Sequence, residues 1–313
     1  MSRSDTDTDA GRIGVLIMAY GTPRHPGEIE AYYTDIRRGN PPSPEQLADL
    51  TARYSAIGGT SPLAARTDDQ RAAIQEALDE LAPGRYRTVL GLKHADPKIE
   101  DAVNALGAEG CTRIVGLVLA PHFSSMSVGQ YLARARAAGE PLGIDVVGIE
   151  SWATEPPYID FLVEQVTSGL ARLPDATTVL FTAHSLPQRV VDGGDPYPDE
   201  LQSTAKAVAD GVPLTSASSW MTAWQSAGRT PEPWLGPDVL EVIDDLADAH
   251  AAEGLLVCAC GFVSDHLEVL YDLDIEARKR AEGRGLSFAR TECLNDNPAV
   301  MSALAARIHA AAR

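Results

Sequence analysis

The sequence alternates short apolar runs, rich in β-branched residues, with longer segments of helical period, and this alternation limits the folds open to the chain. Strands that alternate with helices pair in parallel, and a parallel sheet is covered by helices on both faces. We expect seven strands: RIGVLIMAYGTP (12–23), RTVLGLKHADP (87–97), TRIVGLVLAPHFS (112–124), IDVVGIESW (144–152), TTVLFTAHSLP (177–187), SASSWMTAWQSAG (216–228) and GLLVCACGFV (254–263). The pattern predicts an α/β fold.

The segments between these runs have the spacing of crossover helices. They are 68–81, 98–108, 158–173, 199–211 and 238–252. The 313 residues fall into two similar halves, 12–150 and 151–290. We expect a flexible polar leader at 1–11 and a C-terminal helix within 291–313 that packs back on the body. A chain of this length, with 44% hydrophobic residues, is long enough to form two domains of ordinary size.

Charge and composition exclude several classes of function. The formal net charge is −18, whereas a nucleic-acid partner demands a basic surface. No run approaches eighteen apolar residues and the start is polar and acidic, so we expect a cytoplasmic protein without membrane insertion. The four cysteines, Cys111, Cys258, Cys260 and Cys293, are too scattered for a disulfide scaffold or for the usual spacing of iron–sulfur ligands. We expect reduced thiols.

Polar residues that could take part in catalysis or ligand binding follow the predicted strands. In open α/β sheets, ligands bind beyond the carboxyl ends of the strands. The residues at or just past those ends are Tyr20, His94, His122, His184, Gln225, Ser226, His266 and Glu268. A single histidine at a strand end commonly only bonds a loop, but the joint occurrence favours one polar cleft.

Three carboxylates after the last predicted strand, Glu268, Asp272 and Glu276, are spaced i, i+4, i+8. On a helix this spacing places them along one face, where like charges repel unless a cation lies alongside. The row is either a solvated acidic face or a site that handles a divalent metal, with His184 and His266 as the nearest imidazoles. Imidazole together with carboxylate suits Fe²⁺, whereas an all-oxygen set would suit Mg²⁺ or Ca²⁺.

Basic residues gather near YYTDIRRG (32–39) and DLTARYSAIGGTSPLA (49–64). Arg37, Arg38 and Arg53 lie there beside the hydroxyls of Tyr54 and Ser61. Because the planar guanidinium matches a carboxylate in two places, the cluster suits a ligand with several carboxylates. Ordinary surface charge is the alternative interpretation.

Nine motifs, in order along nearly the whole chain, carry a family resemblance. They are MAYGTP, YYTDIRRG, RYSAIGGTSPLA, LGLKH, LAPHFSSMSVGQY, AHSLP, GDPYPDEL, WQSAGRTPEPWLGPD and GFVSDHLEVLYDLD. From about Gly14 onward the chain resembles the ferrochelatases, and most closely the monomeric coproporphyrin III ferrochelatases of Gram-positive bacteria. The resemblance implies two Rossmann-like, chelatase-type halves with the active-site cleft between them.

The resemblance also implies roles for individual residues. His184 and Glu268 would be catalytic and would bind the metal on the iron side of the porphyrin. Tyr20, on the opposite face, would contact the substrate and serve as axial ligand to the product iron. Asp272 and Glu276 would pass metal inward, and Arg53 would lie near the outer end of that row. The substrate-binding positions are Tyr20, Arg37, Arg53, Tyr54, Ser61, Tyr131, Trp234 and His94, of which the last two have less settled roles.

The implied activity is insertion of Fe²⁺ into coproporphyrin III to give coproheme in haem biosynthesis. Three alternatives remain open: protoporphyrin IX as the substrate, a porphyrin carrier without chemistry, and a chelatase for another tetrapyrrole and metal. YGTP is too short for a phosphate-binding glycine fingerprint, so no nucleotide is expected. Without a cysteine-bearing C-terminal extension, we expect a monomer with no [2Fe–2S] cluster. A downstream haem-synthesis decarboxylase is a possible partner.

Overall fold

A computed structural model describes residues 12–228 and 230–313, so the leader expected at 1–11 lies outside the described residues. The fold is built on two four-stranded sheets, of order β2-β1-β3-β4 and β6-β5-β7-β8, in which every pairing is parallel. The strands are β1 (Ile13–Ala19), β2 (Tyr86–Leu92), β3 (Arg113–Val118), β4 (Asp145–Ile149), β5 (Thr177–His184), β6 (Ser219–Gln225), β7 (Gly254–Cys258) and β8 (Ser287–Arg290). The two halves share one strand order, which confirms two Rossmann-like halves.

Helices cover the sheets because the strands are apolar on both faces. All seven residues of β1 are buried, as a parallel strand requires. The α-helices are α1 (Ile29–Ile36), α2 (Pro44–Ala56), α3 (Leu63–Leu81), α4 (Ile99–Ala108), α5 (Val128–Gly139), α6 (Pro156–Leu170), α7 (Gln188–Asp192), α8 (Tyr197–Gly211), α9 (Val239–Asp248), α10 (Arg278–Gly283) and α11 (Pro298–Ala311). Two short 3₁₀ turns, η1 (Pro26–Glu28) and η2 (Glu140–Leu142), and one π-helix, η3 (Val269–Ala277), complete the elements.

The structure extends the sequence prediction in several places. The five expected crossover helices are present as α3, α4, α6, α8 and α9, with ends shifted by a few residues. The count of seven strands was wrong, because the residues described include an eighth, β8, a four-residue edge strand in which only Phe288 is buried. No helix among the described residues is long and apolar enough to cross a membrane.

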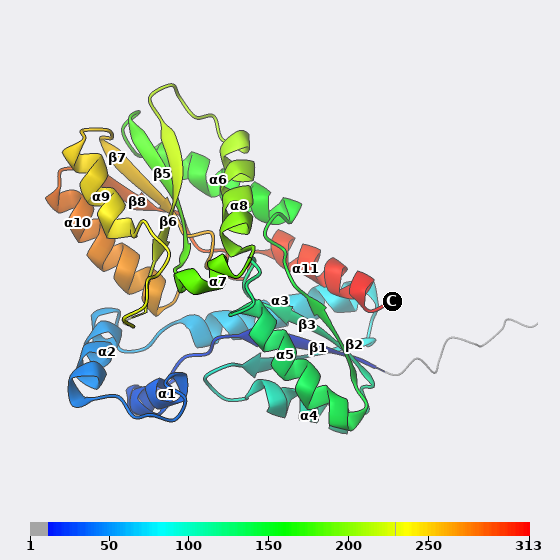
Figure 1. The fold of residues 1–313 in the computed structure, drawn as a ribbon. Helices are drawn as coiled ribbons and strands as arrows, with labels where there is room; N and C mark the ends of the chain where they lie inside the picture. The colour runs from blue at the N-terminus through cyan, green and yellow to red at the C-terminus, as the bar shows by residue number, and fades with distance from the viewer. Residues whose placement is uncertain (1–11, 229) are drawn as a thin grey trace, which may run out of the picture.

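The C-terminal helix α11 connects the two halves. It packs against α3 and β4 from the first half and α6 from the second. Its apolar residues Val300, Leu304 and Ile308 belong to a core cluster that also holds Ile17 of β1 and Phe181 of β5. In Figure 1 the sheet of β5–β8 lies at upper left and that of β1–β4 at lower right, with α11 (red) beside α3. One continuous core therefore fixes the relative position of the sheets.

Candidate active site

The strand order determines where the polar residues meet. In each sheet the chain goes from a central strand to the strand on one side of it and then crosses to the strand on its opposite side. The carboxyl ends of β1 and β3, and those of β5 and β7, therefore flank a crevice. His184 is the last residue of β5, and Glu268 follows the loop that leaves β7 and directly precedes the π-helix. Neighbouring strand ends therefore bring His184 and Glu268 together.

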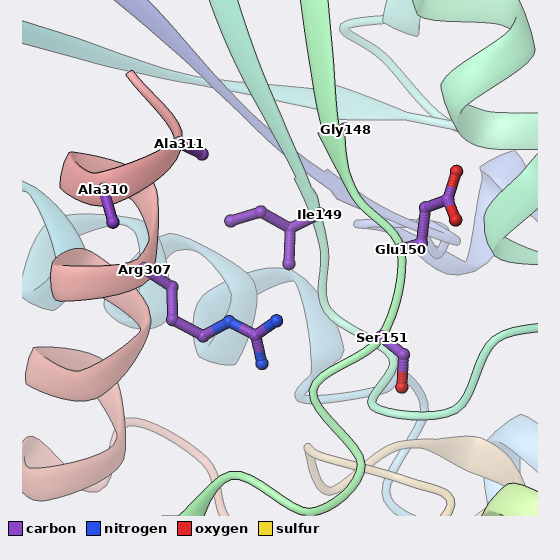
Figure 2. Close-up of a pocket in the computed structure, with 7 residues that line it drawn as sticks. All are labelled: Gly148, Ile149, Glu150, Ser151, Arg307, Ala310 and Ala311. Carbon is purple, nitrogen blue, oxygen red and sulfur yellow. The ribbon is translucent and has the colours of Figure 1, made fainter. Parts of the chain in front are cut away.

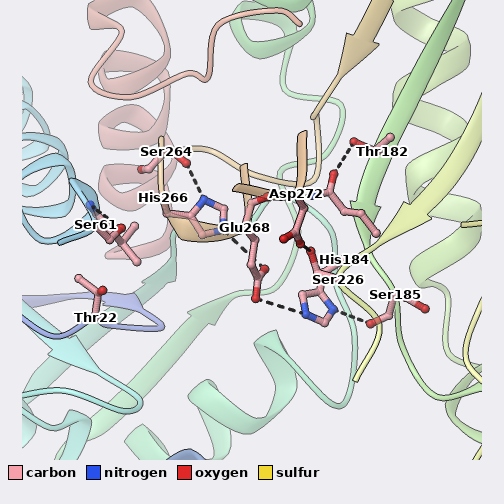
Figure 3. A network of polar contacts seen from close by, with 12 residues as sticks. Thr22, Ser61, Thr182, His184, Ser185, Ser226, Ser264, His266, Glu268 and Asp272 are labelled. Carbon is pink, nitrogen blue, oxygen red and sulfur yellow. Dashed lines mark hydrogen bonds and ion pairs between the residues drawn. The ribbon is translucent and has the colours of Figure 1, made fainter. Parts of the chain in front are cut away.

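Glu268 lies between two imidazoles (Figure 3). Its Oε1 is 3.7 Å from Nε2 of His184, and its Oε2 is 3.6 Å from Nε2 of His266. The Nδ1 atoms of both rings face backbone carbonyls, that of Ser185 at 2.5 Å and that of Ser264 at 2.9 Å. Because a carbonyl only accepts, both Nδ1 atoms carry the hydrogen in the neutral rings. Both Nε2 lone pairs then face the carboxylate, an arrangement that favours a proton or cation between them.

A buried glutamine connects the end of β5 with the segment that contains Glu268. Gln225, the last residue of β6, accepts from the hydroxyl of Thr182 at 2.9 Å and donates to the carbonyl of Glu268 at 3.4 Å. Its own carbonyl accepts from the N–H of Ser185 at 2.8 Å. The His184 carbonyl accepts from the hydroxyl of Tyr197 at 3.2 Å. The facing groups are therefore held by the backbone of β5 and β6.

Electrostatics keep Glu268 ionised. Burial by itself would raise the pKa of Glu268, but the charge of His184, a hydrogen bond with His266 and the charge of Arg53 together hold it below its ordinary value. A carboxylate that stays charged can stabilise an imidazolium beside it. The site is therefore suited to receive protons on His184.

The predicted carboxylate row lines a single pocket. Glu268, Asp272 and Glu276 border a space of about 260 Å³ together with Arg53 and Ser226. Asp272 accepts a short hydrogen bond of 2.5 Å from the hydroxyl of Ser226, whose φ of 60° is uncommon for a residue other than glycine. Burial and the charge of Glu268 raise the pKa of Asp272 to about 6. The row runs into a π-helix rather than an α-helix, and such helices occur frequently at functional sites.

Arg53 lies with this acidic row rather than with Arg37. Its Nη1 is 3.3 Å from Oδ1 of Asp272, its Nε is 3.5 Å from Asp49, and its guanidinium stacks over the ring of Tyr271 at 4.8 Å. The residue pattern alone grouped Arg53 with the neighbouring arginines, whereas the family resemblance implied a place near the carboxylate row. In the structure it joins α2 of the first half to the π-helix of the second.

Arg37 and Arg38, the other arginines of the predicted basic cluster, directly follow α1. Arg37 donates to the carbonyl of Asn40 at 3.2 Å and lies 5.7 Å from the centre of the Tyr33 ring. Within residues 12–228 and 230–313, neither Arg37 nor Arg38 forms an ion pair with a carboxylate. Both guanidinium groups can therefore receive an anionic ligand.

Tyr20 and His94 end adjacent strands and pack together, with ring centres 4.6 Å apart. Tyr20 is 42% exposed, unusual for a large aromatic residue in this chain. Asp35 accepts from Nδ1 of His94 at 2.7 Å and from the ammonium of Lys98 at 2.9 Å. Sequence reasoning missed Asp35, because its partners lie 59 and 63 residues away and no local pattern marks it.

The other predicted substrate positions are more enclosed. Tyr54 is buried, with its hydroxyl 3.2 Å from that of Thr22. Ser61 is buried and accepts from the N–H of Leu63, and Tyr131 is buried beneath the ammonium of Lys93. The ring of Trp234 is centred 6.5 Å from that of His184.

His122 does not belong to the polar cleft expected from the strand ends. It is 2% exposed, and its Nε2 lies 2.9 Å from the hydroxyl of Thr204. Burial lowers its pKa to about 3, so the ring stays neutral. The strand end predicts where the backbone of His122 lies, but the loop after β3 turns its side chain into the core.

Three further observations concern metal binding and the rest of the described residues. Among the residues that the structure describes, no group of three or more His, Cys, Asp or Glu side chains has the geometry of a metal site. A separate shallow pocket of about 490 Å³ lies between β4 and α11 (Figure 2), and it contains none of the predicted site residues. All four cysteines are free and buried.

Two solved chelatases have a similar fold. The chain superimposes with a TM-score of 0.59 on SirB from Bacillus subtilis with Fe³⁺, at 12% identity, covering 96% of each chain. The TM-score is 0.57 for the sirohydrochlorin chelatase SirB from Bacillus subtilis subspecies spizizenii in complex with cobalt, again at 12% identity, over 96% of this chain and 95% of that one. At this identity the likeness establishes the fold, which is that of the chelatases.

Sequence comparison is more specific. The Ferrochelatase family model matches residues 12–312. A coproporphyrin III ferrochelatase of Halalkalibacterium halodurans is 47% identical, over 94% of this chain and 95% of that protein. A coproporphyrin III ferrochelatase of Bacillus subtilis is 43% identical, over 94% and 96%. The chain belongs to the Ferrochelatase family and is a metal chelatase, with ferrous iron as the metal substrate and a porphyrin as its acceptor.

Proposed function

We propose that the chain inserts Fe²⁺ into coproporphyrin III to give coproheme. The observation that carries the proposal is the lone pair on Nε2 of His184, which faces the carboxylate of Glu268 at 3.7 Å in the crevice between the halves. Relatives at 42–47% identity over most of their length are named coproporphyrin III ferrochelatases. Coproporphyrin III carries more propionates than protoporphyrin IX, and the unpaired guanidinium groups of Arg37 and Arg38 support the more acidic substrate.

The chemistry requires that two pyrrole N–H protons leave as the metal enters. His184 accepts a pyrrole proton on Nε2 or ligates the incoming iron there, because Nδ1 is committed to the carbonyl of Ser185. Glu268, held ionised, stabilises the imidazolium and passes the proton onward. The two roles of His184 are compatible, since the ring can release the proton before the metal binds.

Binding of the rest of the macrocycle supplies the distortion that exposes a pyrrole nitrogen. Arg37 and Arg53 bind propionates, and Tyr54, Ser61, Tyr131, Trp234 and His94 contact the ring or its substituents. Tyr20 lies on the opposite face from His184 and ligates the iron of the product. The exposure of Tyr20 supports this role, because a phenol that ligates product iron must reach the cleft.

Iron reaches the ring along Asp272 and Glu276, with Arg53 at the outer end of the row. The pKa of Asp272, raised to about 6, leaves this carboxylate ionised at neutral pH and so able to attract the cation. The 2.5 Å bond from Ser226 and the pairing with Arg53 hold Asp272 in place between deliveries.

The proposal includes the setting of the reaction. The catalyst is a cytoplasmic monomer with domains 12–150 and 151–290, it needs no nucleotide and no [2Fe–2S] cluster, and a decarboxylase consumes its product.

One relative keeps protoporphyrin IX open as the alternative substrate. A protein of Herpetosiphon aurantiacus, 42% identical over 94% of this chain and 97% of that protein, is named only ferrochelatase. Anaerobic Fe²⁺ insertion should therefore be timed on coproporphyrin III and on protoporphyrin IX with the same enzyme. We expect the faster rate on coproporphyrin III. The reverse order would select protoporphyrin IX, and no acceleration on either would indicate a carrier or a chelatase for another tetrapyrrole and metal.

A further inference from the structure

A guanidinium buried behind the active site contacts the segments on both sides of Glu268. Arg290 is the last residue of β8, and its side chain is only 12% exposed. Its Nε donates to Oδ1 of Asp274 at 2.9 Å and its Nη2 donates to Oδ2 at 3.0 Å, which is a bidentate pairing. Such a fork fixes orientation as well as distance. Asp274 belongs to the π-helix, so Arg290 fixes the helix face that points away from the cleft.

The same guanidinium reaches the loop that precedes the site. Nη2 of Arg290 also donates to Oδ1 of Asp265 at 3.3 Å. The other oxygen of Asp265 accepts from the side-chain amide of Asn295 at 2.9 Å, and Asn295 Oδ1 accepts the N–H of Asp265 at 3.1 Å. Nη1 of Arg290 donates to the carbonyl of Thr291 at 2.8 Å, so the side chain is itself anchored.

The two carboxylates bracket the working residues. Asp265 directly precedes His266, which lies against Glu268, and Asp274 follows Asp272 by two residues. The π-helix, which contains Asp274, is nine residues long, whereas π-helical geometry normally occupies a single turn. Slippage of one residue into ordinary α-helix would rotate the following side chains by about 100° around the axis. An anchor on the other face of the helix therefore helps to keep the carboxylate row facing the cleft.

We propose that Arg290 is a positioning residue for metal binding. Its rigid guanidinium holds both Asp265 and Asp274. It thereby sets the positions of His266, Glu268 and Asp272. This inference rests on the proposed function, since it assigns Arg290 to the handling of iron rather than of porphyrin. Arg290 is not among the residues that line the pocket, nor is it one of the predicted substrate positions. Its loss should therefore change metal affinity and leave porphyrin affinity intact.

The matched variants are Arg290→Lys and Asp274→Asn, which alter the fork with little change in volume. Lysine keeps the positive charge but cannot bond both oxygens of Asp274 together with Asp265. The control is Arg307→Lys, because Arg307 on α11 also pairs with a carboxylate, Glu155 at 3.0 Å, far from the row. All three variants are expected to lower the melting temperature, so stability alone does not discriminate.

The test has two measurements. The first is titration of the porphyrin-free protein with Co²⁺, followed by the visible absorption of the ion. The second is the KM for Fe²⁺ in coproporphyrin III insertion, with the porphyrin Kd measured in parallel. We expect Arg290→Lys and Asp274→Asn to weaken Co²⁺ binding and raise the iron KM by about tenfold, as for other residues that orient metal-binding side chains. The porphyrin Kd should stay within about twofold, and Arg307→Lys should match wild type in both.

The outcomes separate the inference from the proposed function. Wild-type Co²⁺ affinity in Arg290→Lys, absence of Co²⁺ binding by the wild-type protein, or an equal loss in Arg307→Lys would each overturn the role of Arg290. A different result would separate the two claims: wild type binds Co²⁺ but inserts no iron, and Arg290→Lys binds Co²⁺ more weakly than wild type. That result would support the positioning role and remove the proposed function alone.

Discussion

The guanidinium of Arg53 on α2 lies 3.3 Å from the carboxylate of Asp272 on the π-helix, although the two residues are 219 positions apart. This pair joins the halves across the cleft at the middle residue of the carboxylate row. It places a positive charge on the proposed path of the iron. Formation of the ion pair between Arg53 and Asp272 should therefore be linked to the binding of metal.

Arg53→Met should raise the iron KM more than the porphyrin Kd. Removal of the guanidinium deletes a charge that lowers the pKa of Asp272, so more of this carboxyl is protonated near neutral pH. Steady-state kinetics with iron varied, beside a porphyrin titration, measure both quantities. Arg66→Met, which breaks only an exposed pair with Asp69, is the control. A rise in porphyrin Kd with an unchanged iron KM would restrict Arg53 to propionate binding and remove it from the path of the metal.

The iron KM should fall as the pH rises through about 6, because Asp272 gains its charge there and then attracts the cation. In Ser226→Ala the midpoint should move to higher pH, since the lost hydrogen bond stabilised the ionised form. The measurement is the KM for Fe²⁺ from pH 5 to 8 under anaerobic conditions. Identical profiles for wild type and Ser226→Ala would remove Asp272 from the path of the metal.

Gly261→Ala should separate the loop after β7 from β5. A Cβ at Gly261 would lie 2.4 Å from Cβ and 2.6 Å from Cα of Ala183, the residue before His184. The backbone of β5 cannot yield as a flexible side chain would, so we expect a lower melting temperature and loss of iron insertion. Gly283→Ala, in open space within α10, should be neutral or slightly stabilising. An active, stable Gly261→Ala protein would show that the spacing of His184 and Glu268 is not critical.

His122 should make stability depend on pH. The unfolded chain binds a proton here below its ordinary pKa of 6.5, whereas burial lowers the folded pKa to about 3. The unfolded state thus holds more protons between these values, and the free energy of unfolding falls as the pH drops through this window, by at most about 1.4 kcal/mol per pH unit. Urea unfolding of His122→Asn should show a shallower fall than wild type. His250→Asn, at an exposed position, should keep the wild-type slope.

The fold and the centre of the site were predictable because both follow from local patterns. Apolar runs mark parallel strands, and strand ends then bring Tyr20, His94 and His184 to the crevice. The partners of Arg53 and Arg290 were not predictable, since ion pairs between distant segments leave no periodic signal in one sequence. The short strand β8 lacks an apolar run, and no composition rule separates the π-helix from an α-helix. His122 shows the limit of the strand-end rule, because the loop decides which way a side chain turns.

Anaerobic Fe²⁺ insertion into coproporphyrin III by wild type and by His184→Ala tests the proposed function most directly. Wild type should accelerate formation of the iron porphyrin, and His184→Ala should abolish it while porphyrin binding stays within about tenfold, or roughly 1.4 kcal/mol. Insertion at the wild-type rate by His184→Ala, or no acceleration by wild type, would contradict a reaction centred on His184 and Glu268.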